Sequence, residues 1–494
     1  MAETNSGPTT GSGYWNEIKG KVGFYIKLGF LMFLVLLLLV PLALIENLVG
    51  ERKARRDTAV AGIAQSWGHP QRITGPVLLI PYSYTIPPQP FVNTKGETQM
   101  TPAETRIGTI HVLPETVNIG GVIEPTVRYR GIYRAILYTT ALKIRGSFAM
   151  PDLKTLSVKP DEVLWDSAVF AMGVYDLRGA RGDSRLTWDG QRFDFKPRTR
   201  STILGPGLHA PIRLAAPDPS ATAQPILFNF DIRFTGSRRI AFTPVGKTST
   251  VSLASAWRHP SFDGAYLPTE RKIGAEGFSA TWAISYLGRN YPQAWKSHGS
   301  KGAPLPVHAI GRQMASSQFG VSLVTPVDFY LKAERSVKYG ILFVLLVLAA
   351  IFAFDVAGGL NLHVFQYALV GFALCVFYLL LLSLAEFAGF LLAYLAAAAM
   401  ATAMIGFYAA KVMGGWARAG VIAGLLGVIY GFLYVVLQLE DYALLVGALG
   451  VFAALAAVMY GTRNVDWHAL RGGPAPREAP EQAPNAAPKA AIET

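Results

Sequence analysis

The sequence predicts an α+β membrane protein with one N-terminal transmembrane helix, a β-rich, sandwich-like extracytoplasmic domain and then a bundle of five transmembrane helices. Two observations predict this fold. Five long apolar stretches crowd the last third of the 494 residues, and a sixth stands alone near the start. Between them lies more polar sequence with the alternation of β-strands, interrupted by clusters of Gly, Pro and Asp.

The first apolar stretch, Leu28–Ile45, carries no charge and has about the length that a helix needs to cross a bilayer. Lysines precede it, as they precede the core of a signal peptide, and a removed signal peptide is the alternative. The stretch is longer than such a core, and its last residues form a poor cleavage site. We therefore expect a cytoplasmic tail at residues 1–24 and an uncleaved transmembrane helix at residues 25–48.

The C-terminal apolar cluster divides at its few polar breaks into five runs of membrane-spanning length. We expect these runs to form one bundle over residues 339–461, with transmembrane helices at about 339–359, 364–385, 387–410, 419–439 and 442–461. Residues 462–494 are rich in Pro, Ala and Glu and lack an apolar pattern, so they are expected to form a disordered cytoplasmic tail.

Basic residues predict how the chain is oriented. The short loop with Lys411 and Arg418 falls on the same side of the predicted membrane as the tail after Arg463. The short loops on the other side hold only acidic residues. Because Lys and Arg favour the cytoplasmic loops, both termini are expected in the cytoplasm, and the large domain of residues 49–338 outside it.

Period-two alternation predicts the strands of that domain. In the segment 226–234, Phe228, Phe230 and Ile232 fall on one face of a strand. Similar strand-like segments occur at residues 106–113, 127–142, 250–257 and 278–286. Many strands bounded by turn residues favour a sandwich or barrel-like domain. One helix, from Arg52 to about Trp67, is expected to continue the first span.

Composition and motifs argue against several functions. The net charge of +13 is explained by basic residues beside membrane spans, so the lipid bilayer is the expected partner and nucleic acid is not. The segment Ala241–Thr248 loosely fits a phosphate-binding loop, but strand-like sequence follows where a helix is required. We therefore expect no nucleotide.

Metal and catalytic signatures are also missing from the sequence. Cys375 is the only cysteine, so neither an intramolecular disulfide nor a cysteine-based metal site can form. No two histidines lie three or four residues apart, and no Gly-x-Ser-x-Gly motif occurs. We expect no catalytic residue, no cofactor and no metal.

A candidate functional surface includes the densest polar and aromatic cluster of the large domain, with Trp257, Arg258, His259 and Asp263. Such residue types favour ligand or partner surfaces. The alternative, favoured by the many turn residues in this segment, is a structured loop packed on the sheet. In either case we expect the first three residues at or near the surface. The rest of the candidate surface lies in or near the predicted bundle, at Asp328, His363, Gln366 and Glu386.

The bundle itself predicts close helix packing and little ion movement. Its charged residues fall at predicted helix ends, whereas ion-coupled transporters place ionisable groups at mid-depth. One face of the span 419–439 carries a row of glycines that predicts close packing within the bundle, at Gly420, Gly424, Gly427 and Gly431. A symmetric homodimer through this glycine row is the alternative.

These segments together resemble the CreD family of bacterial inner-membrane proteins from the first span to about Trp467. The similarity is carried, in order, by Trp67–Gly68, Arg130–Tyr133, Asp176–Gly179, Thr243–Lys247, Trp257–Phe262, Gly277–Trp282, Thr325–Tyr330, Leu362–His363, Gln366–Tyr367, Glu386 and Thr462–Trp467. Two positions depart from the family pattern. Phe387 stands where the family often has His, and Asp355 where it often has Glu.

The resemblance implies a protein of the bacterial inner membrane with a role in cell-envelope integrity and stress response. It carries over no catalytic residue. Our first hypothesis is a non-enzymatic protein that acts through its periplasmic domain on an envelope protein or lipid partner. The alternatives are a membrane-embedded enzyme or lipid-handling protein, with a site where the periplasmic domain meets the bundle, and a transporter or channel.

Overall fold

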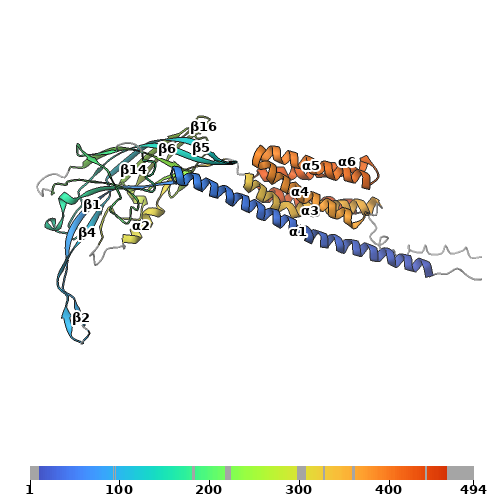
Figure 1. The fold of residues 1–494 in the computed structure, drawn as a ribbon, viewed down its shortest axis with the longest axis horizontal. Coiled ribbons are helices and arrows are strands. Elements are labelled where there is room, and N and C mark those ends of the chain that lie inside the picture. The colour runs from blue at the N-terminus through green and yellow to red at the C-terminus, as the bar shows by residue number, and fades with distance from the viewer. Residues whose placement is uncertain are drawn as a thin grey trace, which may run out of the picture. The chain divides into compact units, whose positions relative to one another are not determined.

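The computed structural model of the chain describes residues 11–92, 94, 96–180, 184–216, 224–297, 307–325, 329–358, 362–439 and 442–463 (Figure 1). The chain divides into two compact units, a membrane unit of residues 1–53 and 328–494 and a β domain of residues 54–327. One helix, α1 (Gly11–Trp67), contributes to both units without a break. This confirms the prediction that a helix ending at about Trp67 continues the first span.

The first sheet of the β domain is mixed and is organised around β1 (Gln71–Ile86). This strand pairs antiparallel with β4 (Glu104–Val112) and β7 (Val169–Val174), and parallel with β13 (Arg239–Phe242). Among the described residues the sheet also contains β10 (Lys196–Pro197), β11 (Gly207–Pro211), β15 (Pro260–Gly264), β18 (Ala294–Lys296) and β19 (Phe319–Leu323).

The second sheet is built on the long hairpin of β5 (Thr116–Arg130) and β6 (Tyr133–Phe148), which pair antiparallel in continuous register. Its strand order is β16-β17-β14-β5-β6-β12-β8-β9 in the part of the chain that the structure describes. The bounds of the other strands are β8 (Arg185–Trp188), β9 (Gln191–Asp194), β12 (Ile226–Ser237), β14 (Thr248–Ser255), β16 (Glu270–Gly274) and β17 (Gly277–Ser285).

The two sheets share one hydrophobic core, which confirms the predicted sandwich. Phe170 on the first sheet lies 5.4 Å, between ring centroids, from Phe228 on the second. Trp282 and Phe319 make a second contact of this kind at 5.6 Å. From Leu227 to Phe234 the burial along β12 alternates residue by residue, so Phe228, Phe230 and Ile232 face the core as the sequence predicts.

Several short elements were not predicted from the sequence. An arm of β2 (Pro90–Val92) and β3 (Thr98–Met100) extends the β1–β4 pair (Figure 1). A helix, α2 (Val307–Ser316), and three 3₁₀ turns, η1 (Pro160–Glu162), η2 (Trp165–Ser167) and η3 (Tyr286–Gly288), also belong to this domain. The predicted strand at 127–142 contains the turn between β5 and β6, where Gly131 adopts a φ of +61°.

Apolar helices make up the membrane unit. They are the first part of α1, then α3 (Phe329–Gly358), α4 (Val364–Ala388), α5 (Phe390–Val412), α6 (Trp416–Gln438) and α7 (Ala443–Thr462). Among the described residues, α1, α3, α4, α5 and α6 are long and apolar enough to cross a membrane, and α7 contributes a shorter apolar helix over Ala443–Ala457. Helix α3 begins before residue 339, where the predicted span starts, because polar residues at its N-terminal end add further turns.

Leucines of α1 pack into the membrane unit where two glycines leave room. Leu34, Leu38 and Leu42 are buried in its core. A Cβ atom added to Gly371 of α4 would lie 2.4 Å from Leu38, and one added to Gly340 of α3 would lie 3.2 Å from Leu42. Small residues at these two positions therefore let α1 approach its neighbours closely.

The glycine row of α6 does not admit a neighbouring helix in this way. The row consists of Gly420, Gly424, Gly427 and Gly431. A Cβ added to any of the four would meet no atom within 4 Å among the described residues. The expectation that this row packs inside the bundle is therefore wrong. α6 instead buries its larger side chains, such as Leu426 and Leu433, and its glycines lie along an open face.

Candidate functional site

The loop between β14 and β15 presents two charged or titratable side chains on a rigid support. Arg258 and His259 are exposed and Trp257 is half-buried, which confirms their predicted place at the surface. The indole Nε1 of Trp257 donates to the carbonyl oxygens of His259 at 3.1 Å and Val324 at 3.0 Å. Among the described residues, neither the Arg258 nor the His259 side chain has a partner. Trp257 thus holds the loop, while its two neighbours are available for contact.

Asp263, the fourth residue of this predicted surface, has a structural contact on each oxygen. Arg239 Nε donates to its Oδ1 at 2.7 Å, and the Ser322 hydroxyl donates to its Oδ2 at 2.5 Å. These bonds join β15 to β13 and β19 within the first sheet. The carboxylate is therefore used inside the domain, as the alternative of a structured loop requires.

Segments that carry the family resemblance meet where α1 enters the β domain. Gln71 is fully buried, and its side-chain Nε2 donates to the carbonyls of Asp176 at 2.9 Å and Thr235 at 2.7 Å. Its Oε1 accepts from the backbone N–H of Asp176 at 3.2 Å. The Asp176 carboxylate in turn accepts from the guanidinium of Arg178, which also donates to the carbonyl of Gln65 at the end of α1. We call these four residues, Gln65, Gln71, Asp176 and Arg178, the helix joint.

Thr235 and Gly179 complete this contact. The Thr235 hydroxyl donates to the carbonyl of Trp67 at 2.5 Å. A Cβ added to Gly179 would lie 1.7 Å from that hydroxyl oxygen, so only glycine fits there. The last turn of α1 is therefore bound by hydrogen bonds to two separate segments of the β domain.

Burial alone would raise the pKa of Asp176, but hydrogen bonds from the Arg178 side chain and from the backbone N–H groups of Arg178 and His69 lower it to about 2. An unfolded Asp has a pKa of about 3.9.

Because the pKa of Asp176 is lower in the folded than in the unfolded protein, its ionised carboxylate contributes stability above pH 4 that is lost as the pH falls towards 2. We expect a loss of about 2 kcal/mol over this window, measured by denaturant unfolding of the protein. The Asp176→Asn variant should lack this part of the pH dependence, and an unchanged slope would contradict the assignment.

Glu386, predicted as a candidate residue, ends α4 in a cluster of charged and polar groups. Its Oε1 accepts from the Tyr330 hydroxyl at 3.1 Å, and its Oε2 lies 3.6 Å from Arg52 Nη1. The Tyr330 side chain is fully buried and that of Glu386 nearly so. Beside them, Glu334 lies between Lys53 at 3.4 Å and Lys338 at 2.8 Å. These ion pairs join α1, α3 and α4 to one another.

His363 and Gln366 lie at the opposite end of α4. The His363 Nδ1 accepts from the Phe365 N–H at 3.2 Å, and the Gln366 Oε1 accepts from the His363 N–H at 2.9 Å. These bonds cap the helix. About 30–35 Å of helix separates them from Glu386, so the three side chains do not form one cluster. Asp328 lies outside the described residues.

A buried charge that sequence analysis noted only as a family departure lies at the same end of the bundle as His363. Asp355, near the end of α3, forms an ion pair with Lys27 of α1. Its carboxylate also accepts from the Tyr367 hydroxyl at 2.7 Å and from the Leu362 N–H at 3.0 Å. Asp355 is only 3% exposed. In the sequence, the available signal for this pair was a lysine next to the first apolar stretch and an aspartate between two later apolar stretches.

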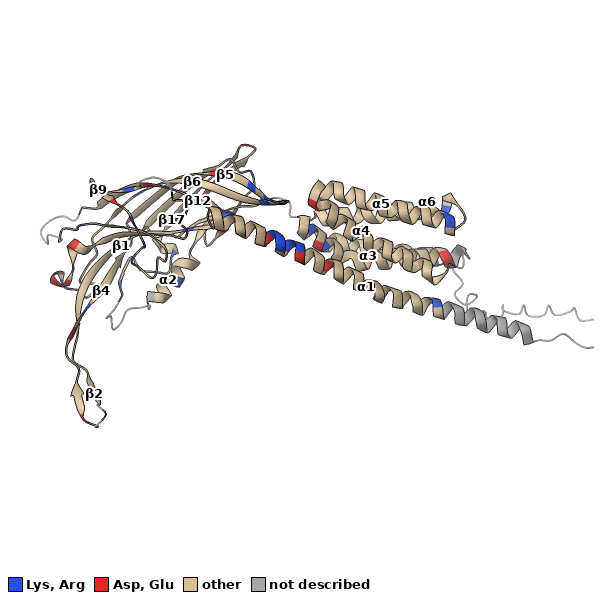
Figure 2. Cartoon of the chain, in the orientation of Figure 1, with Lys and Arg blue, Asp and Glu red and all other residues tan. Residues whose placement is uncertain are grey.

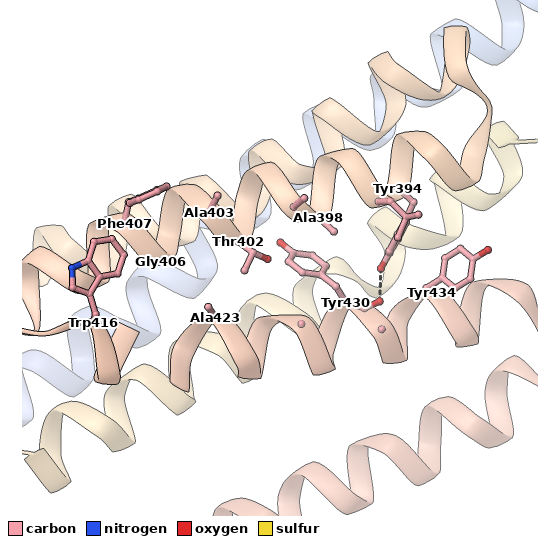
Figure 3. A pocket seen from close by; sticks show the side chains of 14 residues that line it. Tyr394, Ala398, Thr402, Ala403, Gly406, Phe407, Trp416, Ala423, Tyr430 and Tyr434 are labelled. Carbon is pink, nitrogen blue, oxygen red and sulfur yellow. Dashed lines mark hydrogen bonds between the residues drawn. The ribbon is translucent and has the colours of Figure 1, made fainter. Parts of the chain in front are cut away.

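An open groove runs along the seam between α5 and α6 (Figure 3). Its volume is about 670 Å³, and small residues such as Ala403, Gly406 and Gly427 form its walls. The Tyr394 hydroxyl donates to the Tyr430 carbonyl at 2.7 Å, while the buried Tyr430 hydroxyl has no partner among the described residues. The groove suits an apolar chain, and no carboxylate, histidine or cysteine lines it.

Within the described residues, no group of three or more His, Cys, Asp or Glu side chains lies close enough to hold a metal ion. The segment with the loose phosphate-loop pattern leads directly into β14, as predicted, and two of its carbonyls are held by Arg289. A phosphate-binding loop requires a helix at that point.

An apolar helix that enters a β sandwich, followed by a bundle of apolar helices, defines an α+β integral membrane protein. Residues 23–468 match the family model described as "Inner membrane protein CreD". The chain is also 30% identical over 453 residues to "Inner membrane protein CreD" of Escherichia coli (strain K12), covering 91% of this chain and 95% of that protein. The chain therefore belongs to the CreD family of inner membrane proteins.

Proposed function

We propose that this protein supports the integrity of the bacterial cell envelope under stress, without catalysing a reaction, through a β domain in the periplasm. Both termini would then lie in the cytoplasm. The observation that carries the proposal is the attachment of α1. The helix is tied to the β domain by the helix joint and to the bundle by the pairs that Lys27 and Arg52 form. A helix anchored in each unit by that unit's own contacts suits a structural rather than a catalytic role.

In this proposal, the side chains that contact a partner molecule are those that are not paired within the described part of the chain. Charged side chains of the membrane unit, such as Asp355 and Glu386, have partners within that unit. Arg258 and His259 project from a loop that Trp257 holds in place. We propose that these two side chains contact an envelope protein or the head group of a lipid. Residues presented on a rigid loop lose little conformational freedom on binding.

A lipid-handling role is the second candidate, and the groove between α5 and α6 favours it. The groove is open, apolar and about 670 Å³ in volume, within the range of small-molecule sites. From Tyr394 to Phe407 it follows about 20 Å of helix, which accommodates a hydrocarbon chain. Filling the groove should then abolish function, whereas the first proposal requires the loop in the β domain.

Complementation of a bacterium that lacks its own family member separates the two candidates. We expect the double variant Arg258→Ala, His259→Ala to lose most of its ability to protect the cell against detergent and large antibiotics. The variant protein itself should remain folded in the membrane. Gly427→Leu narrows the groove at a position where an added Cβ meets no described atom within 4 Å, and this variant should protect fully. The control Glu270→Ala, Lys272→Ala changes two exposed residues of β16. The reverse pattern would favour lipid handling and contradict the first proposal.

A further inference from the structure

His111 is a buried titratable side chain that neither the helix joint nor the proposed function uses. It lies on β4, in the first sheet, and is 5% exposed. Its ring stacks on that of Trp295 in β18, with ring centroids 5.1 Å apart and an angle of 7° between the ring planes. The Ser201 hydroxyl lies 3.5 Å from His111 Nε2. We call these three residues, His111, Ser201 and Trp295, the histidine latch.

The surroundings of His111 favour its neutral form. The contact between Nε2 and Ser201 is at the outer limit of a hydrogen bond, and Nδ1 has no partner among the described residues. Burial lowers the pKa of His111 to about 4, against a weaker and opposite effect of the Thr109 backbone. The attraction of a cation to the indole face of Trp295 offsets only part of the cost of burying an ion.

Among the described residues, the elements packed around the ring bring no carboxylate to it. β1 places Leu79 opposite His111, and β18 places the indole of the latch there. Lys296 and Arg200, next to these contacts in the sequence, are basic and would repel a protonated ring. His209, on β11 of the same sheet, is separated from it by β1 and β7. Figure 2 shows no charged residue in the half of β4 that carries His111.

The strand β18 can leave the latch with little loss of structure. It has three residues and pairs with β4 alone, at an edge of the first sheet. Hydrogen bonds of Gln293 and Ser297, on either side of it, hold it in place. The buried indole Nε1 of Trp295 has no partner among the described residues, so release gives two unpaired ring nitrogens of the latch access to water. Short edge segments open at a lower free energy than central strands.

We propose that the histidine latch is a pH-dependent switch, in which protonation of His111 releases β18 from β4 and the neutral ring keeps β18 bound. In the open form the pKa of His111 has its ordinary value of about 6.5, which is higher than in the closed form. The closed form therefore loses stability as the pH falls from about 6.5 towards 4. Release uncovers the Trp295 indole and the unpaired backbone groups of β4, which a partner strand can bind. Only the compartment in which the switch meets acid rests on the proposed function.

Hydrogen–deuterium exchange of the full chain in nanodiscs tests the switch without reference to cell protection. The peptide that contains β18 should open about 30-fold more at pH 5 than at pH 7.5, because the pKa of His111 is about 4 in the closed form and about 6.5 in the open form. Comparing parent and variants at one pH cancels the effect of pH on the exchange chemistry. Peptides from β7 should keep their protection at both pH values, and their exchange together with β18 would show global unfolding and overturn the inference.

Matched variants assign the response to one ring. His111→Phe keeps a ring on Trp295 but has no titratable nitrogen, so β18 should exchange equally at both pH values after correction for chemistry. His111→Gln gives a second variant without a titratable group. His308→Gln, at an exposed position on α2, and His209→Gln, at the other buried histidine of this sheet, should respond as the parent does. A response that persists in both His111 variants, or that disappears in His209→Gln, would overturn the inference.

Discussion

Replacing Asp355 by Asn is expected to destabilise the membrane unit by about 3 kcal/mol. The carboxylate is buried and accepts from Lys27, the Tyr367 hydroxyl and the Leu362 N–H. Removing its charge leaves a partly buried lysine without a counter-charge, and breaking a buried pair in this way costs about 3–5 kcal/mol. The lower end applies because Lys27 is 23% exposed. The loss would loosen α1 from the bundle.

Cys375 provides the measurement. It is the only cysteine, is buried in α4 and belongs to the core that α1 helps to form. Its reaction with a thiol-specific dye during heating or denaturation in detergent therefore reports opening of the membrane unit. We expect Asp355→Asn to react at a clearly lower temperature than the parent protein.

Two further variants make the Asp355 result specific. Glu334→Gln removes a more exposed pair and should cost less than about 1 kcal/mol. The double variant Lys27→Met, Asp355→Leu removes the unpaired charge of Lys27 and should recover part of the stability. The recovery is incomplete because the Tyr367 hydroxyl and the Leu362 N–H lose their acceptor. Equal dye reactivity in Asp355→Asn and the parent would show that the pair does not hold α1.

Gln71→Met is expected to destabilise the β domain by about 3–5 kcal/mol. The Gln71 side chain, with no exposed surface, satisfies the carbonyls of Asp176 and Thr235 and the N–H of Asp176. Methionine has a similar size but makes none of these bonds. Each buried backbone group left without a partner costs about 1–3 kcal/mol. The helix joint would then lose the link between β1 and the two segments that hold α1.

Tryptophan fluorescence during urea unfolding measures this effect, because Trp188, Trp282 and Trp295 are buried in the β domain. The matched control is Gln191→Met, an exposed position on β9, which should unfold like the parent. Cys375 reactivity should change little in Gln71→Met, since that thiol lies in the other unit. A Gln71→Met transition that coincides with the parent would contradict the role assigned to this side chain.

Local patterns in the sequence predicted most of the secondary structure. Apolar runs indicated the spans, and alternation in residues 226–234 placed Phe228 and its neighbours on the core side of β12. The absence of a break between Arg52 and Trp67 indicated the long α1. The arm of β2 and β3 was missed because three-residue strands carry too little periodicity to distinguish them from loops. Helix α2 was missed although its ten residues are amphipathic.

The candidate site was predicted only in part. Trp257, Arg258 and His259 lie at the surface as expected, because turn residues surround them in the sequence. Asp355 was noted without its partner, and Gln71 was not noticed. Lys27 and Asp355 are 328 residues apart, and no local pattern relates positions at such a separation.

By itself, the sequence determined the class of protein, the order of its units and the faces that its strands bury, since these follow from hydrophobic periodicity within single segments. Only the tertiary structure decided which charges pair across the bundle and how the helix joint holds α1. It also decided that Gly340 and Gly371, rather than the glycine row of α6, admit a neighbouring helix. These contacts depend on which helices and strands become neighbours, and that arrangement arises only when the whole chain packs.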